Sequence, residues 1–358
     1  MNKTTSIIIP TYNERDNIVA LVERIDHALA SHDYEVVFID DNSTDGTAEL
    51  VRSLSSRYPV EVIVRQNKRG LASAVVDGIG YASGQFVGVM DADLQHPPEV
   101  ILDLLREMKG GADIAIASRY VEGGGCQGWG LVRRIISKGA IVLAHLFLPA
   151  TRLVKDPMSG FFMFQRQVVA QAHLEPTGFK ILLEILMEGK SQNIVEVPYI
   201  FRTRSVGESK LSTRQQVDYL KHLYSLMKRK GELRRFLKFC LVGGSGVFVN
   251  MGLLWVLTEI AGLFYLLSAA ISIETSIISN FILNNQFTFR DRGSSGVKSF
   301  FNRLVKFNLV SLVGLGINMG VLWLLTEVFG LYYLLSNLCG IAVATLWNYL
   351  VNTWWTWK

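Results

Sequence analysis

The first half of the chain alternates short apolar runs with segments in which apolar residues recur at helical spacing. The apolar runs, rich in β-branched residues, occupy residues 6–9, 35–39, 60–64, 85–90 and 113–117. Between the first two runs, residues 13–31 place apolar side chains on one helical face: Ile18, Leu21, Val22, Ile25 and Leu29. Apolar strands alternating with amphipathic helices indicate an α/β fold, with a mostly parallel sheet covered by helices on both faces.

Polar side chains follow three of these predicted strands, at the points where the strands end. Tyr12 comes after the first strand, Asp40-Asp41 after the second, and Asp91-Ala92-Asp93 after the fourth. Ligands of parallel sheets bind outside the carboxyl ends of the strands. We therefore expect these three distant stretches to converge on one crevice.

The loop after the fourth strand carries the most informative chemistry. Asp91 and Asp93 are followed by the amide of Gln95, and such oxygen ligands suit a hard cation such as Mg²⁺ or Mn²⁺. A lone Asp-x-Asp would favour the alternative of a polar turn without a metal. The second acidic turn, at Asp40-Asp41, favours the metal site. His96 is interpreted as a helix-capping or supporting residue and not as a ligand.

The last third of the chain is much more apolar than the rest. Four segments, each near the ~20 residues that a bilayer core requires, lie at about residues 239–260, 264–283, 307–328 and 332–351. Residues 236–358 contain 7 Lys and Arg and 4 Asp and Glu, whereas the first 235 residues contain 29 and 27. The pattern predicts a globular domain of nearly balanced charge joined to four transmembrane helices.

An internal duplication relates the two halves of this apolar region. A shift of 68 positions superimposes residues 236–289 on residues 304–357 without a gap. Polar and small residues match as well as apolar ones, as in Asn250 with Asn318, Trp255 with Trp323, Gly262 with Gly330, Asn280 with Asn348 and Asn284 with Asn352. Each copy holds two spans, which predicts two parallel repeats related by a pseudo-two-fold axis. The paired Asn residues are expected to join helices by hydrogen bonds, with lipid transport as the alternative.

Positive charge gathers on the loop between the two copies. Five cations lie there: Arg290, Arg292, Lys298, Arg303 and Lys306. The outer hairpins carry Glu259 and Glu327, so the positive-inside rule predicts that both termini are cytoplasmic. The formal net charge of +5 is too small and too local to indicate nucleic acid binding. The N-terminal segment does not resemble a signal peptide, and three isolated Cys residues indicate free thiols in a reducing compartment.

Two amphipathic segments are expected at the membrane surface. Residues 129–149 mix basic and apolar positions and are too interrupted by charge to span a bilayer, although an ordinary packed helix is the alternative. Residues 211–235 carry an apolar stripe beside many cations. The predicted organisation is a cytoplasmic domain at 1–210, a basic interface helix and linker at 211–235, and a transmembrane domain at 236–358.

Several ordered motifs resemble those of a known family. Residues 8–14, 40–46 and 91–96 are similar to the family 2 glycosyltransferases, which have a nucleotide-sugar-binding GT-A fold. Residues 156–162 and 178–180, and Arg204 with residues 207–210, narrow the resemblance to polyprenyl-phosphate sugar transferases. Over its whole length the chain looks most like the archaeal type of dolichol-phosphate mannose synthase, with a GtrA-like four-helix membrane domain.

The resemblance implies roles for particular donor-side residues. The positions that hold the nucleoside are matched by Pro10, Tyr12, Glu14, Ile39 and Asp41. The positions that hold the sugar diphosphate and metal are matched by Asp91, Ala92, Asp93 and Gln95, of which Asp93 and Gln95 would be direct metal ligands beside Asp91. Arg204 and Lys210 match cations that close over the diphosphate. Val206 departs from the pattern, because another basic residue is expected there.

On the acceptor side the resemblance implies that Arg119, Arg133 and Ser137 hold a phosphate. The implied catalytic set is Asp91, Asp93, Gln95 and Arg119. A phosphate monoester has a second pKa near ~6 and is largely dianionic at neutral pH. Such an acceptor needs no general base, unlike a hydroxyl acceptor. A single displacement would invert the anomeric configuration.

The implied activity is metal-dependent transfer of mannose from GDP-mannose to dolichyl or another polyprenyl phosphate at a membrane. Glucose transfer from UDP-glucose to a polyprenyl phosphate is the alternative within the same class. A flippase or membrane scaffold, whose front domain only binds a nucleotide-sugar, is the alternative of another class. A processive polysaccharide synthase is disfavoured because the chain has no Gln-x-x-Arg-Trp stretch.

Overall fold

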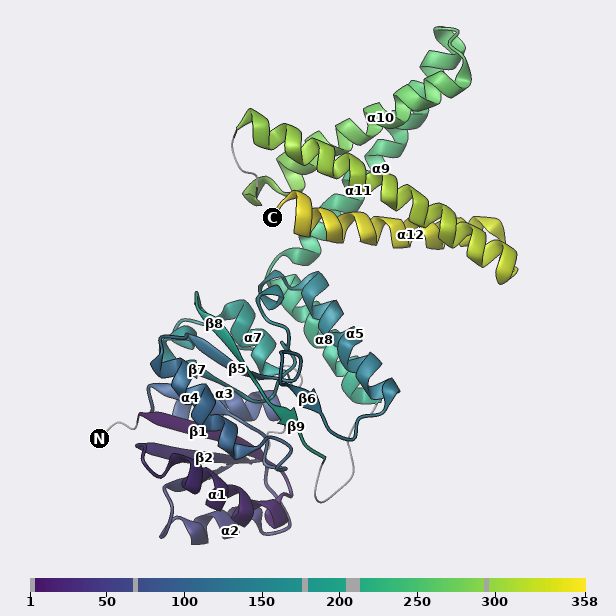
Figure 1. Cartoon of the computed structure of the whole chain (residues 1–358). Coiled ribbons are helices and arrows are strands. Elements are labelled where there is room, and N and C mark those ends of the chain that lie inside the picture. The colour runs from purple at the N-terminus through teal and green to yellow at the C-terminus, as the bar shows by residue number, and fades with distance from the viewer. Residues whose placement is uncertain (1–3, 67–69, 176–179, 204–212, 293–295) are drawn as a thin grey trace. The chain divides into compact units, whose positions relative to one another are not determined.

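A computed structural model describes residues 4–66, 70–175, 180–203, 213–292 and 296–358 (Figure 1). The chain forms two compact units, residues 1–226 and residues 227–358. The boundary falls inside a helix near the end of the predicted 211–235 segment, and that segment is divided between the two units. The described part of each unit is considered by itself below.

The first unit is built on a seven-stranded sheet. Its strand order is β3-β2-β1-β4-β7-β5-β8, and β6 pairs with β9 in a second, two-stranded sheet. The strands are β1 Thr5–Thr11, β2 Tyr34–Asp40, β3 Val60–Val64, β4 Phe86–Val89, β5 Ile114–Ser118, β6 Gly125–Cys126, β7 Phe162–Gln165, β8 Ile194–Pro198 and β9 Ile200–Phe201. All neighbours in the large sheet are parallel except those of β7, which is antiparallel to β4 and β5.

The helices of the first unit lie on both faces of this sheet (Figure 1). They are α1 Arg15–Leu29, α2 Thr47–Leu54, α3 Leu71–Tyr81, η1 Pro98–Val100, α4 Ile101–Lys109, α5 Leu131–Phe147, η2 Pro149–Leu153, α6 Arg166–Val169, α7 Ile181–Glu188 and α8 Thr213–Arg229. Ile7 and Ile9 of β1 pack in the core with α1, α2 and α4, whereas Ile8 packs with α3, α6 and α7. Alternation along a strand therefore supplies two separate cores.

The five strands predicted from apolar runs are all confirmed, as is the predicted first helix. Strand β7 was not predicted from the sequence. Its residues 162–165 run antiparallel between β4 and β5. The sheet is therefore mixed but mostly parallel, as the predicted fold class requires.

Helices α5 and α8 lie side by side (Figure 1), and the Tyr219 hydroxyl of α8 donates to the Ala140 carbonyl of α5 over 2.7 Å. Helix α5 occupies most of the predicted 129–149 segment. Apolar side chains on it are exposed, among them Leu131 at 74% and Val132 at 70%. Leu220 and Tyr224 of α8 are also more than half exposed. These faces suit a lipid surface, and contact with a membrane stays a prediction.

The second unit contains four helices that are long and apolar enough to cross a membrane, at Glu232–Ile260, Tyr265–Thr288, Val297–Val328 and Tyr333–Thr356. In detail they comprise α9 Glu232–Trp255 with η3 Val256–Ile260, α10 Tyr265–Leu283 with η4 Asn284–Thr288, α11 Val297–Trp323 with η6 Leu324–Val328, and α12 Tyr333–Val351 with η7 Asn352–Thr356; η5 Arg290–Arg292 follows η4. The segments η3, η4, η6 and η7 are π-helical turns that continue the preceding helix.

The 68-residue duplication is visible in these helix bounds. Three of the four segments of the first copy, η3, α10 and η4, recur 68 positions later with the same length. Phe289 and its counterpart Trp357 stack on each other, with ring centroids 4.3 Å apart. Contacts around them are reciprocal, since Phe239 meets Tyr349 and the counterpart Phe307 meets Phe281. Reciprocal contacts between duplicated residues are what a pseudo-two-fold axis produces.

The duplicated Asn residues pack against glycine where two helices approach closely. A Cβ atom added to Gly246 of α9 would lie 2.3 Å from the Asn280 amide of α10, and one added to Gly314 would lie 2.4 Å from Asn348. The Oδ1 atoms of Asn280 and Asn348 are buried without a hydrogen-bond partner in the described part of the chain. A hydrogen bond between these two helices is made by Ser276 of α10, whose hydroxyl donates to the Gly246 carbonyl of α9. Close packing of small residues is thus the visible role of the Gly–Asn pairs.

We expect Gly246→Ala to destabilise the membrane unit, whereas Gly243→Ala should be neutral or stabilising. The first substitution forces the Asn280 amide aside, and overpacking typically costs about 1–3 kcal/mol. The second adds a Cβ with no atom within 4 Å and removes the helix penalty of glycine, about 1 kcal/mol. Thermal unfolding of the two purified variants in the same detergent measures the difference. Equal melting temperatures would contradict this packing argument.

Candidate active site

The carboxyl edge of β1, β2 and β4 is marked by unusual backbone conformations. Among the described residues, the non-glycine residues with positive φ are Asn13, Asn42 and Leu94, at 55°, 58° and 59°. They lie in the loops that follow β1, β2 and β4 respectively. Left-handed backbone is especially unfavourable for a residue such as leucine, and such strain is concentrated at functional sites. All three loops adjoin the point where the strand order reverses between β1 and β4.

Hydrogen bonds fasten the loops after β1 and β2 to each other. The Asn13 amide N–H donates to the Ser43 hydroxyl over 2.9 Å, and the Thr44 N–H donates to the Asn13 side-chain oxygen over 2.9 Å. The Arg15 N–H donates to the Asp45 carboxylate over 3.1 Å. These hydrogen bonds therefore hold the two loops together at this edge of the sheet.

Sheet register brings the predicted nucleoside-side residues together. Pro10 of β1 lies opposite Ile39 of β2, and the Asp41 N–H donates to the Thr11 carbonyl. Tyr12 is partly exposed in the loop after β1. The Ile39 side chain is fully buried on the α3 side of the sheet, so it offers no exposed surface here. Glu14 precedes α1, where its carboxylate accepts from the Asn17 side chain over 2.8 Å.

Asp41 is held by a buried cation. Its Oδ1 accepts from Arg65, whose Nε lies 2.7 Å away, and its Oδ2 accepts from the Gly70 N–H over 2.8 Å. Arg65 also donates to Asp77 and to the Ser73 hydroxyl of α3. The carboxylate predicted to bind the base or ribose is therefore already fixed in place. Arg65 was not predicted as a site residue.

The predicted metal-binding loop lies directly after β4, because the Met90 N–H still donates to the Ile8 carbonyl of β1. Asp91, Asp93 and Gln95 are all partly buried, and Ala92 between them is buried. The Gln95 N–H donates to the Asp93 carboxylate over 3.1 Å, and the Gln95 side-chain amide donates to the Arg202 carbonyl over 3.0 Å. Two carboxylates and one amide oxygen thus belong to a single ordered turn.

This donor set fits a hard cation in its chemistry, because Mg²⁺ and Mn²⁺ take oxygen ligands and commonly share them with substrate phosphates. No cluster of three or more His, Cys, Asp or Glu side chains with metal-binding geometry occurs in the described part of the chain. The turn therefore resembles a site that relies on an amide and on the substrate for its remaining ligands. Metal binding by Asp91, Asp93 and Gln95 stays a prediction.

His96 packs against this turn from the interior of the protein. It is buried, and its Nδ1 accepts the Asp91 N–H over 3.1 Å. Its ring stacks on Phe161 and meets the edges of Tyr199 and Phe201. Burial, opposed by the negative charge of Asp93, lowers the pKa of His96 to about 4, so the ring is neutral. The supporting role predicted for His96 agrees with these contacts.

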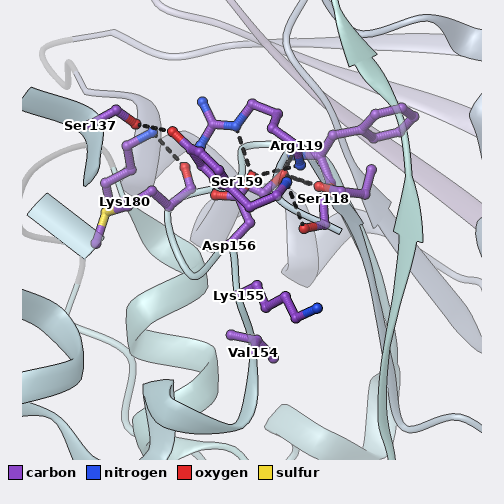
Figure 2. Close-up of polar contacts among 12 residues, drawn as sticks. Ser118, Arg119, Ser137, Val154, Lys155, Asp156, Ser159 and Lys180 are labelled. Atoms are coloured by element: carbon purple, nitrogen blue, oxygen red, sulfur yellow. Dashed lines mark hydrogen bonds and ion pairs between the residues drawn. The ribbon is translucent and has the colours of Figure 1, made fainter. Parts of the chain in front are cut away.

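Arg119, at the end of β5, forms a buried ion pair with Asp156 (Figure 2). Its Nε and Nη2 each donate to a different Asp156 oxygen over 2.7 Å, and its backbone N–H donates over 3.0 Å. Asp156 is fully buried and Arg119 is 8% exposed. Burial alone would lower the pKa of Arg119, but the hydrogen bonds that it donates to Asp156 and the negative charge of that carboxylate raise it. The guanidinium is thus permanently charged and fixed in orientation.

An aromatic ring joins the cations predicted to bind the acceptor. The Arg133 Cζ lies 4.3 Å from the Trp129 ring centroid, and the Arg119 Cζ lies 5.4 Å from it. Ser137 lies beside them, with its hydroxyl 2.9 Å from the Tyr120 hydroxyl. Cation–π contact with one ring holds two like charges close together. Arg119, Arg133 and Ser137 therefore lie in one small region, and phosphate binding by them stays a prediction.

The loop at residues 156–160 links this region to the acidic turn at residues 91–95. The Ser159 hydroxyl donates to the Ala117 carbonyl of β5 over 2.7 Å. Gly160 lies so close to the turn that an added Cβ would be 3.3 Å from the Asp91 Oδ2. The Met158 carbonyl accepts from the Lys180 Nζ over 2.8 Å (Figure 2). Residues predicted to bind the acceptor and residues predicted to bind the donor therefore both lie against this one short loop.

Lys180 adds a third cation to this region. The motif at residues 178–180 includes it, but the resemblance gave it no role. Burial and the positive charge of Arg119 lower the pKa of Lys180 to about 8, against the opposite effect of Asp91 and Asp156. Asp156 and Trp129 were likewise included in predicted segments without a role of their own. The signal available in the sequence was their place in the 156–162 and 129–149 segments. Arg204 and Lys210, predicted to close over the diphosphate, lie outside the described residues.

Comparisons with known proteins agree with this architecture. Residues 6–172 match the family described as Glycosyl transferase family 2, and residues 238–357 match the GtrA/DPMS transmembrane domain. The chain is 48% identical over 354 residues to a protein of Pyrococcus furiosus named Dolichol-phosphate mannosyltransferase, and the match covers 98% of this chain and 99% of that protein.

Two solved structures are similar to part of the chain. Mannosyl-3-phosphoglycerate synthase from Rubrobacter xylanophilus has a TM-score of 0.51 and 19% identity, covers 64% of this chain and 76% of its own, and supports the fold alone. Glucosyl-3-phosphoglycerate synthase from Mycobacterium tuberculosis, in complex with Mg²⁺ and UDP, has a TM-score of 0.47 and 18% identity over 63% of this chain and 80% of its own. The metal and nucleotide are those of that protein.

The mixed sheet, the acidic turn after β4 and the four apolar helices define a glycosyltransferase with a GT-A-like domain and a membrane domain. The chain belongs to the dolichol-phosphate mannosyltransferases of glycosyltransferase family 2.

Proposed function

We propose that this protein transfers mannose from GDP-mannose to dolichyl phosphate, or to another polyprenyl phosphate, and releases GDP. The observation that carries the proposal is the single loop at 156–160, which links the acidic turn after β4 to the buried Arg119–Asp156 pair. An anionic donor and an anionic acceptor both require such a site. The name of the full-length relative supports mannose as the sugar and dolichyl phosphate as the acceptor.

On the acceptor side, Arg119, Arg133 and Ser137 bind and orient the lipid phosphate in this proposal. Arg119 and Arg133 counter the repulsion between the acceptor phosphate and the donor diphosphate. Because the phosphate is already largely ionised at neutral pH, no residue is required to remove a proton from it. Lys180, which directly precedes α7, donates from its Nζ to the Met158 carbonyl of the 156–160 loop and adds positive charge near Arg119. The work of the protein is then positioning and charge stabilisation, and the product has inverted configuration.

On the donor side, Pro10, Tyr12, Glu14, Ile39 and Asp41 line or support the nucleoside pocket. Asp91, Asp93 and Gln95 would hold Mg²⁺ or Mn²⁺, with Ala92 in the same turn, and the bound metal supplies neutralisation of charge on the departing diphosphate. Arg204 and Lys210 close over that diphosphate. Each of these roles is the one that the matching motif position has in the family that the sequence resembles.

The catalytic unit is proposed to lie on the cytoplasmic side of the cell membrane. The cations between the two repeats and the acidic outer hairpins support cytoplasmic termini by the positive-inside rule. The exposed apolar faces of α5 and α8 support contact of the first unit with the bilayer surface. This location places the acceptor-binding cations at the depth of a lipid phosphate.

Product analysis with a panel of donors tests the proposal. Purified full-length protein, supplied with Mg²⁺ or Mn²⁺ and dispersed dolichyl phosphate, is expected to form dolichyl phosphate mannose from GDP-mannose and much less product from UDP-glucose. The lipid product is identified by mass spectrometry in separate single-donor reactions. Product from UDP-glucose alone would favour the glucosyltransferase. Binding of GDP-mannose without any glycolipid product would favour a flippase or scaffold.

A further inference from the structure

The membrane unit contains an open cavity of about 490 Å³ at the ends of its first two helices. Its lining consists of Gly231, Arg234, Arg235, Lys238, Phe287, Thr288, Arg290 and Asp291. Four of these eight residues are cations and one is an anion. All of them belong to the second unit, so the cavity shares no residue with the candidate active site.

The acidic groups near the cavity are already engaged by arginine. Arg235 contacts both Glu232 and Asp291, with nitrogen–oxygen distances of 2.5 Å. Glu232 also accepts from Arg292 over 2.9 Å. Arg234 and Arg290 are exposed at the cavity, and no ion pair of either is seen in the described part of the chain. The cavity therefore retains excess positive charge after its ion pairs are formed.

Backbone polarity adds to this charge. Helix α9 begins at Glu232, directly after the cavity residue Gly231, and the N-terminal end of a 24-residue helix carries partial positive charge. Exposed N-terminal turns of helices bind phosphate groups well when cations surround them. Two independent features, side-chain charge and helix polarity, thus favour an anion in the same cavity.

The cavity also has an apolar side. Phe287 is 58% exposed, and the Lys238 Nζ donates to the Phe287 carbonyl over 3.3 Å. Both lie at the end of spans that are long and apolar enough to cross a membrane. A phosphate group attached to a hydrocarbon chain matches cations beside an exposed aromatic ring at this depth.

We propose that this cavity binds the phosphate headgroup of an anionic membrane lipid. The site goes beyond the proposed transfer reaction, because it uses none of the residues assigned to donor, acceptor or metal. It differs from diffuse attraction of basic residues to a charged surface, since particular side chains enclose the phosphate. Lipid binding there ties the ends of α9 and η4 together and holds the membrane unit at one depth.

The duplication supplies a matched control for this site. The counterparts of Lys238 and Arg290 in the second copy are Lys306 and Lys358, and the counterpart of Arg234 is Asn302. The Lys306 Nζ donates to the Trp355 carbonyl over 3.4 Å, as Lys238 does to the counterpart Phe287. Removing Lys306 and Lys358 therefore changes the net charge as much as removing Arg234 and Arg290, and Lys358 occupies the position equivalent to Arg290.

The experiment compares lipid binding by full-length protein and two double variants in a neutral detergent at fixed salt. The variants are R234Q/R290Q and the control K306Q/K358Q. Dioctanoyl phosphatidic acid is titrated, with dioctanoyl phosphatidylcholine and inorganic phosphate as parallel probes. Native mass spectrometry and the lipid-dependent shift in melting temperature both report binding. R234N is a milder third variant, because asparagine occupies the equivalent position in the second copy.

We expect R234Q/R290Q to weaken binding of phosphatidic acid by about 30-fold, with an intermediate loss in R234N and a change of less than about twofold in K306Q/K358Q. Phosphatidylcholine and inorganic phosphate should bind much more weakly than phosphatidic acid. Equal losses in the two double variants would show diffuse attraction and overturn the proposal. Unchanged binding in R234Q/R290Q and R234N would also overturn it. Inorganic phosphate that binds as tightly as the lipid would overturn the assignment to a lipid.

Discussion

Asp93→Asn is expected to lower kcat by about 100-fold or more while leaving the fold unchanged. The substitution keeps the size of the side chain but removes one negative charge from the proposed metal site. Metal-ion stabilisation of a leaving diphosphate is worth several kcal/mol, and each 1.36 kcal/mol changes the rate about tenfold. Asp93 is partly buried at the edge of the sheet, and its Oδ1 accepts the Gln95 N–H, a hydrogen bond that an asparagine oxygen can also accept.

Three measurements separate a loss of metal from a loss of structure. Mn²⁺ affinity should fall in Asp93→Asn, melting temperature should not, and a chelator should inactivate the unmodified enzyme. Asp103→Asn is the matched control, because Asp103 forms an exposed i,i+3 pair with Arg106 on α4. Full activity of the unmodified enzyme in excess chelator would contradict the metal-dependent mechanism. Equal Mn²⁺ affinity in Asp93→Asn would remove Asp93 from the site.

The second large effect is expected at Asp156. Asp156→Asn leaves Arg119 buried and charged without its carboxylate, and breaking a buried ion pair in this way costs about 3–5 kcal/mol of the free energy of unfolding. The fully buried position of Asp156 and its three contacts with Arg119 support the upper part of this range. The acceptor KM should also rise, because the guanidinium loses its fixed orientation.

A double-mutant cycle tests the origin of the effect. Arg119→Met added to Asp156→Asn should recover part of the lost stability, because the unpaired charge is removed, but it should not recover use of the acceptor. GDP affinity should change little in Arg119→Met, since Arg119 is assigned to the acceptor. Collapse of GDP affinity with an unchanged acceptor KM would reassign Arg119 to the donor side. A loss below about 1 kcal/mol in Asp156→Asn, like that of an exposed pair, would contradict the buried-pair argument.

Periodicity in the sequence predicted the elements well where each element depends on its own residues. The five apolar runs became strands, and the four apolar spans became long helices. These properties are local, because strand alternation and span length are determined within about 20 residues. The place of β7 was not predictable in this way, since Phe162–Gln165 is apolar in the same manner as a parallel strand. Its direction depends on the path of the chain between β4 and β5.

The same division applies to the candidate site. Motifs identified Asp91, Asp93, Arg119 and Arg133, because the types and spacing of these residues carry recognisable chemistry. Motifs did not show that Asp156 forms an ion pair with Arg119 or that Arg65 forms one with Asp41. They also did not show that Trp129 contacts two arginines. The two ion pairs join residues 37 and 24 positions apart in the sequence, and only packing determines which charges meet.

The sequence by itself determined the class of this protein, its duplicated membrane unit and the residue types of its active site, because these follow from local periodicity and from ordered motifs. Tertiary structure alone decided how donor-side and acceptor-side residues are held together through the loop at 156–160. It also decided that the duplicated Asn residues pack against glycine and that basic residues enclose a cavity. The physical reason is that burial and close approach depend on contacts between distant segments, which no local pattern encodes.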